Sequence, residues 1–339
     1  MSNIKVTSQD VATRAGVSQS AVSRVFSGAS ASAATVTKVR KAAEDLGYRP
    51  NSLARAMITG KTKIIGLVVA YLDNQFYPMA LERLSKSLQE KGYQILVFMA
   101  TNEDDTVGKM VDDLIDYQVD GIITASVGMS SDLTLRCATA KIPVVMFNRG
   151  QDGSGHSSIT SANIEGGRKV ADFLVQGGHK RIAHIAGWEG SSTGRDRRRG
   201  FIEGLAAAGQ QPLAIIDGMF DRDTAAAATR TLMATATPPD AIFVGNDHMA
   251  FAVIDTLRQD LGLRVPEDVS VIGYDDVPLA AWGAYQLTTL RQPVNRMVEA
   301  TVETIMGKIE NPDRPAQKIE INGPLIVRRS ARIPQDWTS

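Results

Sequence analysis

The chain has 339 residues, of which 43% are apolar, so it can form two or three domains with a substantial buried core. Its 37 basic and 37 acidic side chains cancel, but residues 1–63 carry ten Lys and Arg against three Asp and Glu, which leaves 27 against 34 for the rest. This asymmetry predicts a basic amino-terminal head that binds a phosphate-bearing partner, attached to an acidic body.

Several classes of protein are excluded at the same level. The first residues, MSNIKVTSQD, contain no apolar signal region, and the longest apolar run, Ile64 to Leu72, is too short to span a bilayer. We therefore expect a cytoplasmic protein with no membrane partner. One cysteine, Cys137, cannot form an internal disulfide, and the four histidines show no ligand spacing, so we expect no metal and no cofactor.

Residues 6–28 predict two short helices joined by a tight turn. Thr7 can cap the first helix, and Asp10 can reach back to the same cap in a capping box. Gly16 and Val17 make the turn, and Ser18 is a suitable cap for the second helix. That helix repeats apolar residues at helical spacing, at Ala21, Val22, Val25 and Phe26. A third helix is expected from a cap at Ser32 to Gly47.

The second helix leaves four residues facing outward: Gln19, Ser20, Ser23 and Arg24. In a helix-turn-helix, the outward residues near the start of the second helix contact base edges in the major groove. A three-helix bundle that binds nothing is the alternative, because apolar residues at this spacing are usually only core. The basic charge of the head favours the DNA-binding interpretation.

The next segment, from 49 to 62, connects the head to the body. Pro50 bars a simple continuation of the third helix, and residues 52–57 could form one short helix that is marginal in water by itself. A flexible linker with solvated Arg55 and Lys61 is the alternative.

From Lys63 onward, continuous Val/Ile-rich runs alternate with amphipathic stretches, first as KIIGLVVA, YQILVFMA, DGIITAS and IPVVMFN, then from RIAHIAG to VSVIGYDD. This alternation predicts two doubly wound lobes with parallel strands buried on both faces. We expect the head at 1–48, a short helix and linker at 49–62, a first lobe that begins with residues 63–161, a second lobe that begins with residues 162–289, and a tail at 331–339.

In open parallel sheets the ligand lies beyond the carboxyl ends of the strands, so two facing lobes place a cleft between those loops. The candidate cleft residues are Asp73, Asn74, Phe76, Asn148, Arg149, Arg197, Phe220, Asn246 and Asp275. Carboxylates, amides, a guanidinium and an aromatic ring suit a sugar or sugar acid. Structural alternatives stay open: Asn246 could cap the next helix, Asp275 could hold a turn, and Phe220 could be core.

Several motifs together resemble the LacI/GalR family of bacterial transcription regulators, over almost the whole chain. These are DVA-x-x-AGVS-x-x-xVSRV in the head, Tyr48-x-Pro50-Asn51, Asn246-Asp247, Gly273-Tyr274-Asp275-Asp276 and Leu287-Thr288-Thr289. The resemblance implies a helix-turn-helix head, a hinge at 49–62 whose short helix orders only with contacts from DNA and a partner hinge, and a two-lobed core like a periplasmic binding protein. It implies further that the chain crosses back, so that residues 290–318 complete the first lobe and residues 319–330 complete the second. It also implies a homodimer on a near-palindromic operator, in which a bound effector changes operator affinity.

The resemblance also implies roles for particular residues. In the family, a hinge helix enters the minor groove and wedges an apolar side chain, commonly leucine, between base pairs, and Met57 stands at that position here. Arg197 in R-x-x-G-F, Asn246 and Asp275 fall on patterns that contact the effector in related regulators. The expected DNA contacts are therefore Thr7, Ser18, Gln19, Ser20, Ser23, Arg24, Asn51, Ala54, Arg55 and Met57.

The expected function is a sequence-specific transcriptional regulator, a repressor of a carbohydrate or related catabolic operon, gated by a sugar or sugar acid. The alternative effector is a nucleobase or phosphorylated metabolite acting as corepressor. An enzyme is not expected, because the sequence has no G-x-S-x-G elbow, P-loop or H-E-x-x-H motif. A solute-binding transport protein would not need residues 1–60. The tail has no heptads, which favours a dimer over a tetramer.

Overall fold

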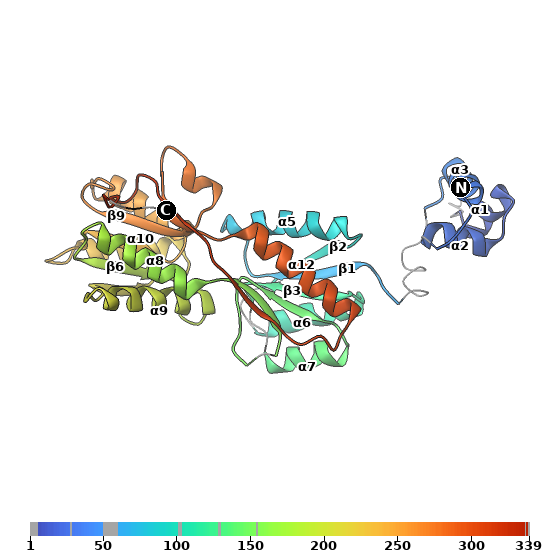
Figure 1. The fold of residues 1–339 in the computed structure, drawn as a ribbon, viewed down its shortest axis with the longest axis horizontal. Coiled ribbons are helices and arrows are strands. Elements are labelled where there is room, and N and C mark those ends of the chain that lie inside the picture. The colour runs from blue at the N-terminus through green and yellow to red at the C-terminus, as the bar shows by residue number, and fades with distance from the viewer. Residues whose placement is uncertain are drawn as a thin grey trace. The chain divides into compact units, whose positions relative to one another are not determined.

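The computed structural model describes residues 6–27, 29–49, 60–100, 104–127, 130–153, 155–335 and 337. The chain divides into two compact units, Met1–Lys63 and Ile64–Ser339 (Figure 1). The predicted hinge helix at 52–57 lies outside the described residues. In the part of the chain that the structure describes, the helices are all too short or too polar to cross a membrane.

The first unit contains three helices, α1 (Ser8–Ala15), α2 (Gln19–Ser27) and α3 (Ala33–Asp45). The predicted capping box is present, because the Thr7 side chain accepts from the Asp10 N–H and the Asp10 carboxylate accepts from the Thr7 N–H at 2.8 Å. Gly16 ends α1 at a φ of 66°, a left-handed conformation that costs glycine little. The helices enclose a small core, formed by Val11, Ala12, Val22, Val39, Ala42 and Ala43.

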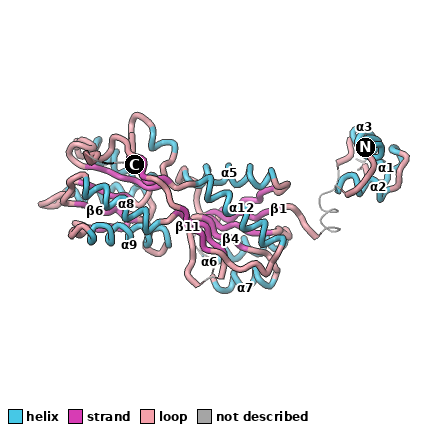
Figure 2. Tube along the Cα trace, viewed as in Figure 1, coloured by secondary structure: helices cyan, strands magenta, loops and turns pink. Residues whose placement is uncertain are grey.

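The second unit has two six-stranded sheets, one in each lobe (Figure 2). The first sheet has the order β11-β5-β4-β3-β1-β2, and its strands are β1 (Ile64–Val69), β2 (Gln94–Met99), β3 (Gly121–Ala125), β4 (Val144–Phe147), β5 (Ser157–Ser161) and β11 (Lys318–Ile321). The second has the order β12-β10-β9-β8-β6-β7, with strands β6 (Ile182–Ala186), β7 (Ala214–Asp217), β8 (Ala241–Val244), β9 (Ser270–Asp275), β10 (Thr288–Arg291) and β12 (Leu325–Ile326). All neighbours pair in parallel except β10 and β12.

Helices cover both faces of each sheet. The first lobe carries α5 (Phe76–Glu90) packed on α12 (Val294–Glu310), and α6 (Asp104–Asp116) packed on α7 (Ser131–Thr139). The second carries α8 (Asn163–Gln176) on α9 (Ser192–Ala207), and α10 (Arg222–Met233) on α11 (Asp247–Asp255), which continues as a π-helical turn over Thr256–Asp260. The predicted return of α12 to the first lobe is confirmed, because it also packs on β3, β4 and β5.

The chain crosses between the lobes near residues 162, 292 and 322, as the ends of the flanking strands show. The expected lobe boundaries at 289/290 and 318/319 need correction, because each cuts through a strand. All of β10 belongs to the second sheet and all of β11 to the first. The physical reason is that β11, with the sequence KIEI, is a half-exposed edge strand without an apolar run, so its sequence gives no signal of which sheet it joins.

Candidate DNA-binding and effector sites

The outward face of α2 carries the residues that were expected to reach DNA. Ser18, Gln19, Ser20, Ser23 and Arg24 are all exposed, whereas Ala21 and Val22 are buried against the other helices. The Ser18 hydroxyl accepts from the Ala21 N–H at 3.2 Å and so caps the helix. Gln19 donates through Nε2 to Ser8 Oγ at 2.9 Å, which ties the start of α2 to α1. The face is polar, basic and accessible, as a major-groove surface requires.

The remaining predicted DNA contacts have different outcomes. Thr7 is exposed, and its hydroxyl already takes part in the capping box of α1. The four hinge residues, Asn51, Ala54, Arg55 and Met57, lie outside the described residues. Their roles at DNA stay predictions.

A pocket of about 490 Å³ lies between the lobes. Its lining comes from the loops after strands of both sheets: Tyr71, Asp73 and Arg149 in the first lobe, and Trp188, Met219, Phe220 and Asp221 in the second. This is the carboxyl edge of the parallel strands, where open sheets bind ligands. The volume suits a small metabolite.

Arg149 is the cationic centre of this pocket. Its Nη1 donates to the Ser126 carbonyl at 2.9 Å and its Nη2 to the Tyr71 hydroxyl at 3.3 Å. The guanidinium carbon lies 5.7 Å from the ring centroid of Trp188 and 5.9 Å from that of Phe220, within range of cation–π attraction. These contacts hold a charged, hydrogen-bonding group between aromatic rings.

Two buried polar atoms, one on the lining residue Arg149 and one on the adjacent residue Asn148, lack protein partners among the described residues. They are Arg149 Nε, a donor, and Asn148 Oδ1, an acceptor. Asn148 itself is fixed, because its Nδ2 donates to the Tyr77 hydroxyl at 2.9 Å. A buried polar group without a partner is costly, so a ligand that pairs with these atoms gains from their prior desolvation.

A second polar cluster, built around Arg197, lies inside the second lobe. Arg197 is only 2% exposed, and it donates to Asn163 Oδ1 at 2.9 Å and to the Gly245 carbonyl at 2.7 Å. Its Nη2 lies 3.6 Å from Asp275 Oδ1, and its guanidinium carbon lies 3.6 Å from the ring centroid of Tyr274. The guanidinium is therefore already satisfied by the protein.

Asp275 links this cluster to the crossing segment and the other lobe. Its carboxylate accepts from Gln292 Nε2 at 2.7 Å, and a hydrogen bond from Asn74, in the first lobe, favours its charged form. Burial raises the pKa of Asp275 to about 6, although Arg197 opposes the shift. Burial, and then the Asp275 charge, raise the pKa of neighbouring Asp247 to about 8.

The predicted effector residues thus separate into groups. Asp73, Arg149 and Phe220 line the pocket, with Asn148 beside it. Asn74, Arg197 and Asp275 form the buried cluster. Asn246 caps α11 through Oδ1, which accepts from the Met249 N–H at 2.9 Å; this is the structural role left open by the sequence.

Phe76 requires a correction, because it does not line the pocket. Its ring is fully buried in the first-lobe core, stacked on Phe147 with the ring centroids 6.1 Å apart. The physical reason is helical geometry: Phe76 is the first residue of α5, and its neighbours Tyr77 and Ala80 share the face that packs on the sheet. Tyr71, earlier in the same loop, is the aromatic residue that the first lobe contributes to the pocket.

The sequence reasoning missed three lining residues, Tyr71, Trp188 and Met219. A usable signal was present for two of them. Tyr71 and Trp188 each stand two residues after the last residue of a buried parallel strand, β1 and β6. An aromatic residue at that place projects from the ligand-binding edge of the sheet.

A helix-turn-helix head joined to a two-lobed core with a ligand-sized pocket defines a class of protein, the DNA-binding regulators that sense small molecules. Residues 7–51 match the lacI family of bacterial regulatory proteins, and residues 171–331 match a periplasmic binding protein-like domain. The described residues contain no group of three or more His, Cys, Asp or Glu placed to hold a metal ion.

Relatives match the chain almost end to end. The HTH-type transcriptional repressor PurR of Photobacterium profundum is 32% identical over 333 residues, 96% of this chain and 98% of that protein. The ribose operon repressor of Escherichia coli K12 is 31% identical over 334 residues, 96% and 99% of the two chains. The crystal structure of the Lac repressor dimer bound to operator and the anti-inducer ONPF has a TM-score of 0.86 at 26% identity, covering 96% and 99%. The chain belongs to the LacI family of DNA-binding transcriptional regulators.

Proposed function

We propose that this protein is a repressor that binds a near-palindromic operator as a homodimer, and that a sugar or sugar acid in the interlobe pocket controls it. In this mechanism the two heads occupy successive major grooves, and the paired hinges open the minor groove between them. Effector binding favours one arrangement of the lobes and changes the spacing of the hinges, so that part of its binding free energy appears as a change in operator affinity.

The observation that carries the effector class is the Arg149 site. A guanidinium with a buried, unpartnered Nε beside the unpartnered Asn148 Oδ1 offers one donor and one acceptor. The aromatic rings of Trp188 and Phe220 suit the apolar face of a sugar, and Asp73 and Asp221 can accept from hydroxyls. A sugar acid adds a carboxylate that pairs with Arg149.

A nucleobase is the second candidate effector. The same two rings could stack on a planar base, and the relatives include HTH-type transcriptional repressors PurR as well as ribose operon repressors, so they do not favour a sugar alone. Such a ligand would act as a corepressor, strengthening operator binding. The two candidates are distinguished by the sign of the change in operator affinity: a nucleobase that acts as corepressor strengthens operator binding, whereas a sugar acid that releases the repressor weakens it.

The first experiment identifies the operator. Purified protein is mixed with sheared DNA of the source genome at moderate salt, and the bound fragments are recovered and sequenced. We expect enrichment of one pseudo-palindrome. Arg24→Ala should lose part of the sequence preference, about 1–3 kcal/mol per base contact, whereas Arg40→Ala, an exposed arginine on α3, removes the same charge and should keep it. Equal behaviour of the two variants would contradict the placement of α2.

The second experiment identifies the effector. A panel of sugars, sugar acids and nucleobases is screened for a rise in melting temperature of the full-length protein, followed by operator titration with each hit. Arg149→Gln should weaken effector binding by about 10–100-fold, because it removes a charge-assisted hydrogen bond. Arg230→Gln, which removes an exposed arginine paired with Asp260, is the matched control. Retained affinity in Arg149→Gln would place the effector elsewhere.

A further inference from the structure

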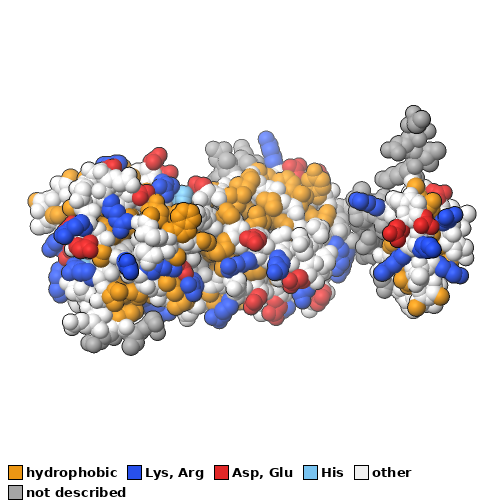
Figure 3. Space-filling model, turned by 90° about the horizontal axis from the view of Figure 1, so that it is seen from above, with side chains coloured by type: hydrophobic (Ala, Val, Ile, Leu, Met, Phe, Trp, Pro, Cys, Tyr) orange, Lys and Arg blue, Asp and Glu red, His pale blue; other side chains and the backbone are white. Residues whose placement is uncertain are grey.

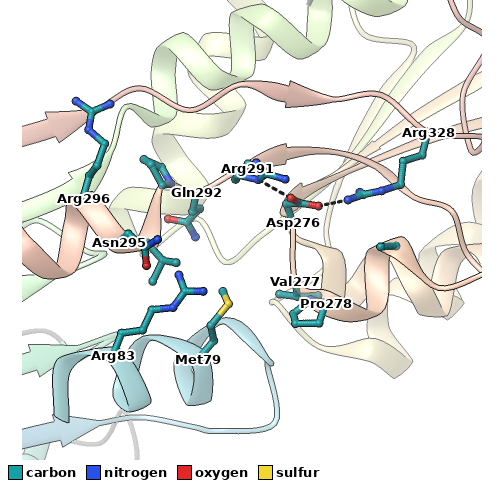
Figure 4. Close-up of a pocket in the computed structure, with 13 residues that line it drawn as sticks. Met79, Arg83, Asp276, Val277, Pro278, Arg291, Gln292, Asn295, Arg296 and Arg328 are labelled. Carbon is teal, nitrogen blue, oxygen red and sulfur yellow. Dashed lines mark hydrogen bonds and ion pairs between the residues drawn. The ribbon is translucent and has the colours of Figure 1, made fainter. Parts of the chain in front are cut away.

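A second pocket, of about 480 Å³, lies beside the segment that crosses between the lobes at residues 292–296. It is separate from the Arg149 pocket and shares no lining residue with it. Figure 4 shows its walls: α5 supplies Met79 and Arg83, the start of α12 supplies Asn295 and Arg296, and the second lobe supplies Asp276, Arg291 and Arg328. The pocket therefore touches both lobes and one connection between them.

The charges of this pocket do not balance. Asp276 is its one carboxylate, and it accepts from Arg291 Nε at 2.6 Å and from Arg328 Nη2 at 2.6 Å. Arg83 has no ion-pair partner among the described residues, and its guanidinium points toward Gln292 and Asn295 in Figure 4. Arg296 stands at the edge with its guanidinium turned away. Three guanidiniums, those of Arg83, Arg291 and Arg328, thus line a pocket that has a single carboxylate.

Two further features favour an anion that also carries hydroxyl groups. Gln292 is only 2% exposed and donates to Asp275 through Nε2, while its Oε1 has no hydrogen-bond partner among the described residues. None of the described side chains caps the amino end of α12, which begins at Val294 on the pocket wall. The uncapped end adds partial positive charge, and Oε1 can accept from a hydroxyl.

Arg291 has spare capacity for a ligand. It contacts Asp276 through Nε, which leaves the two terminal nitrogens of its guanidinium for another acceptor. Arg328 is more constrained, since its Nη1 also donates to the Leu287 carbonyl at 2.7 Å. Phosphate oxygens match the fork geometry of arginine better than a single halide ion does.

We propose that this pocket binds a small phosphorylated metabolite that carries hydroxyl groups, at a site distinct from the effector pocket. The phosphate lies between Arg83 of the first lobe and Arg291 of the second, and a hydroxyl of the same molecule donates to Gln292 Oε1. A ligand held in this way contacts both lobes and stabilises a lobe arrangement that brings Arg83 and Arg291 within reach of one phosphate.

Calorimetric titration of the full-length protein tests this site. Inorganic phosphate, pyrophosphate and glycerol 3-phosphate are titrated separately in a chloride buffer at constant ionic strength. We expect one site per chain, with glycerol 3-phosphate binding more tightly than inorganic phosphate because of the hydroxyl that reaches Gln292. The double variant Arg83→Gln/Arg291→Gln should weaken binding at least about 10-fold, since it removes two charge-assisted contacts.

Matched variants distinguish binding in this pocket from a general effect of positive charge and from binding in the effector pocket. Arg230→Gln/Arg264→Gln removes two exposed, ion-paired arginines of the second lobe and should leave phosphate binding unchanged. An equal loss in this control would mean a general charge effect and would overturn the proposal. Loss in Arg149→Gln, but not in Arg83→Gln/Arg291→Gln, would place the anion in the effector pocket. Absence of binding by all three probes at millimolar concentration would also overturn the site.

Discussion

At the scale of single residues, the buried pair Asp247 and Asp275 sets how stability depends on pH. Asp247 is fully buried and accepts from the Thr289 hydroxyl at 2.6 Å and from the Val277 N–H at 3.0 Å. Burial and the neighbouring carboxylate raise its pKa to about 8. The folded chain therefore holds a proton on this carboxyl at pH values where the unfolded chain has lost it.

The sign of the effect follows directly. Stability from this group is fully present below its unfolded pKa of 3.8 and is lost as pH rises toward 8. Between pH 6.5 and 8 this group lowers the free energy of unfolding of the wild type by about 2 kcal/mol, measured by urea titration as the difference from Asp247→Asn. Asp247→Asn should reduce this fall, because its amide can donate to Thr289 and accept from Val277 at any pH.

The histidines supply the internal control. Burial lowers the pKa of all four histidines, that of His179 and of His184 to about 4, so their contribution to stability is lost as pH falls through 6.5 and has the opposite sign to that of Asp247 in the chosen window. An equally steep pH dependence in Asp247→Asn would show that another group causes the fall.

Arg197 provides a second prediction at this scale. Arg197→Ala leaves Asp275 buried without its cationic partner, so we expect a loss of about 3 kcal/mol in the free energy of unfolding. Arg199→Ala on the same helix removes an exposed arginine paired with Glu203, a contact that solvent screens, and should cost much less than Arg197→Ala. Similar costs for the two variants in urea titration would mean that Arg197 is not the counter-charge of the cluster.

At the scale of elements, α8 and α9 depend on glycine for their close approach. A Cβ added at Gly200 would overlap the Ile164 backbone, and one added at Gly167 would overlap the Arg197 backbone. These atoms belong to the helix main chains, so a side-chain rotation cannot make room. The sequence shows the glycines, but only the packing of the two helices explains why they are needed.

Gly200→Ala should therefore destabilise the protein by about 3 kcal/mol, the upper part of the range for overpacking. Gly108→Ala is the matched control, because a Cβ there meets only side-chain atoms at 3.7 Å and beyond in the middle of α6. Its higher helix propensity should give a gain of about 0.5–1 kcal/mol. Both are measured by urea unfolding of the full-length variants, and a neutral Gly200→Ala would contradict the tight helix contact.

How well a strand could be predicted from the sequence depended on whether both of its faces are covered by apolar side chains. The apolar strands β1, β3, β6 and β8 follow from their continuous Val/Ile-rich runs, because both faces are covered. β5 has the sequence SSITS and gives no such signal, yet it lies inside the first sheet. Its hydroxyls are buried with partners: Ser161 Oγ, for example, lies 3.1 Å from the Tyr274 hydroxyl. Such partners come from distant parts of the chain.

At the scale of the whole molecule, the site was only partly predictable from the sequence. Strand order implied a pocket at the carboxyl edges, and Arg149 and Phe220 follow from that rule. The division between the Arg149 pocket and the buried Arg197 cluster does not follow from it, because both lie near strand ends. Burial separates them, and burial depends on how α8, α9 and the crossing segment pack.

Exposed apolar side chains favour the homodimer. The strand β2 forms one edge of the first sheet, where Val97 is 40% and Met99 is 44% exposed, and Trp282 is 62% exposed in the second lobe. Figure 3, which looks from above the view of Figure 1, shows hydrophobic side chains gathered on the side of the molecule where α5 lies in Figure 1. Exposed apolar groups beside an open sheet edge are a common place for protein association.

We expect Met99→Lys, combined with Val97→Lys, to produce monomers at micromolar concentration, measured by light scattering after size-exclusion chromatography. Two linked heads gain from high effective concentration on a palindrome, so the monomer should bind the operator at least about 100-fold more weakly. Leu135→Lys on α7 is the control, since this leucine is also an exposed apolar residue, at 65%, but lies on the opposite side of the first lobe from β2. A double variant that stays dimeric would exclude β2 from the interface, whereas monomers with unchanged operator affinity would contradict the paired-head mechanism.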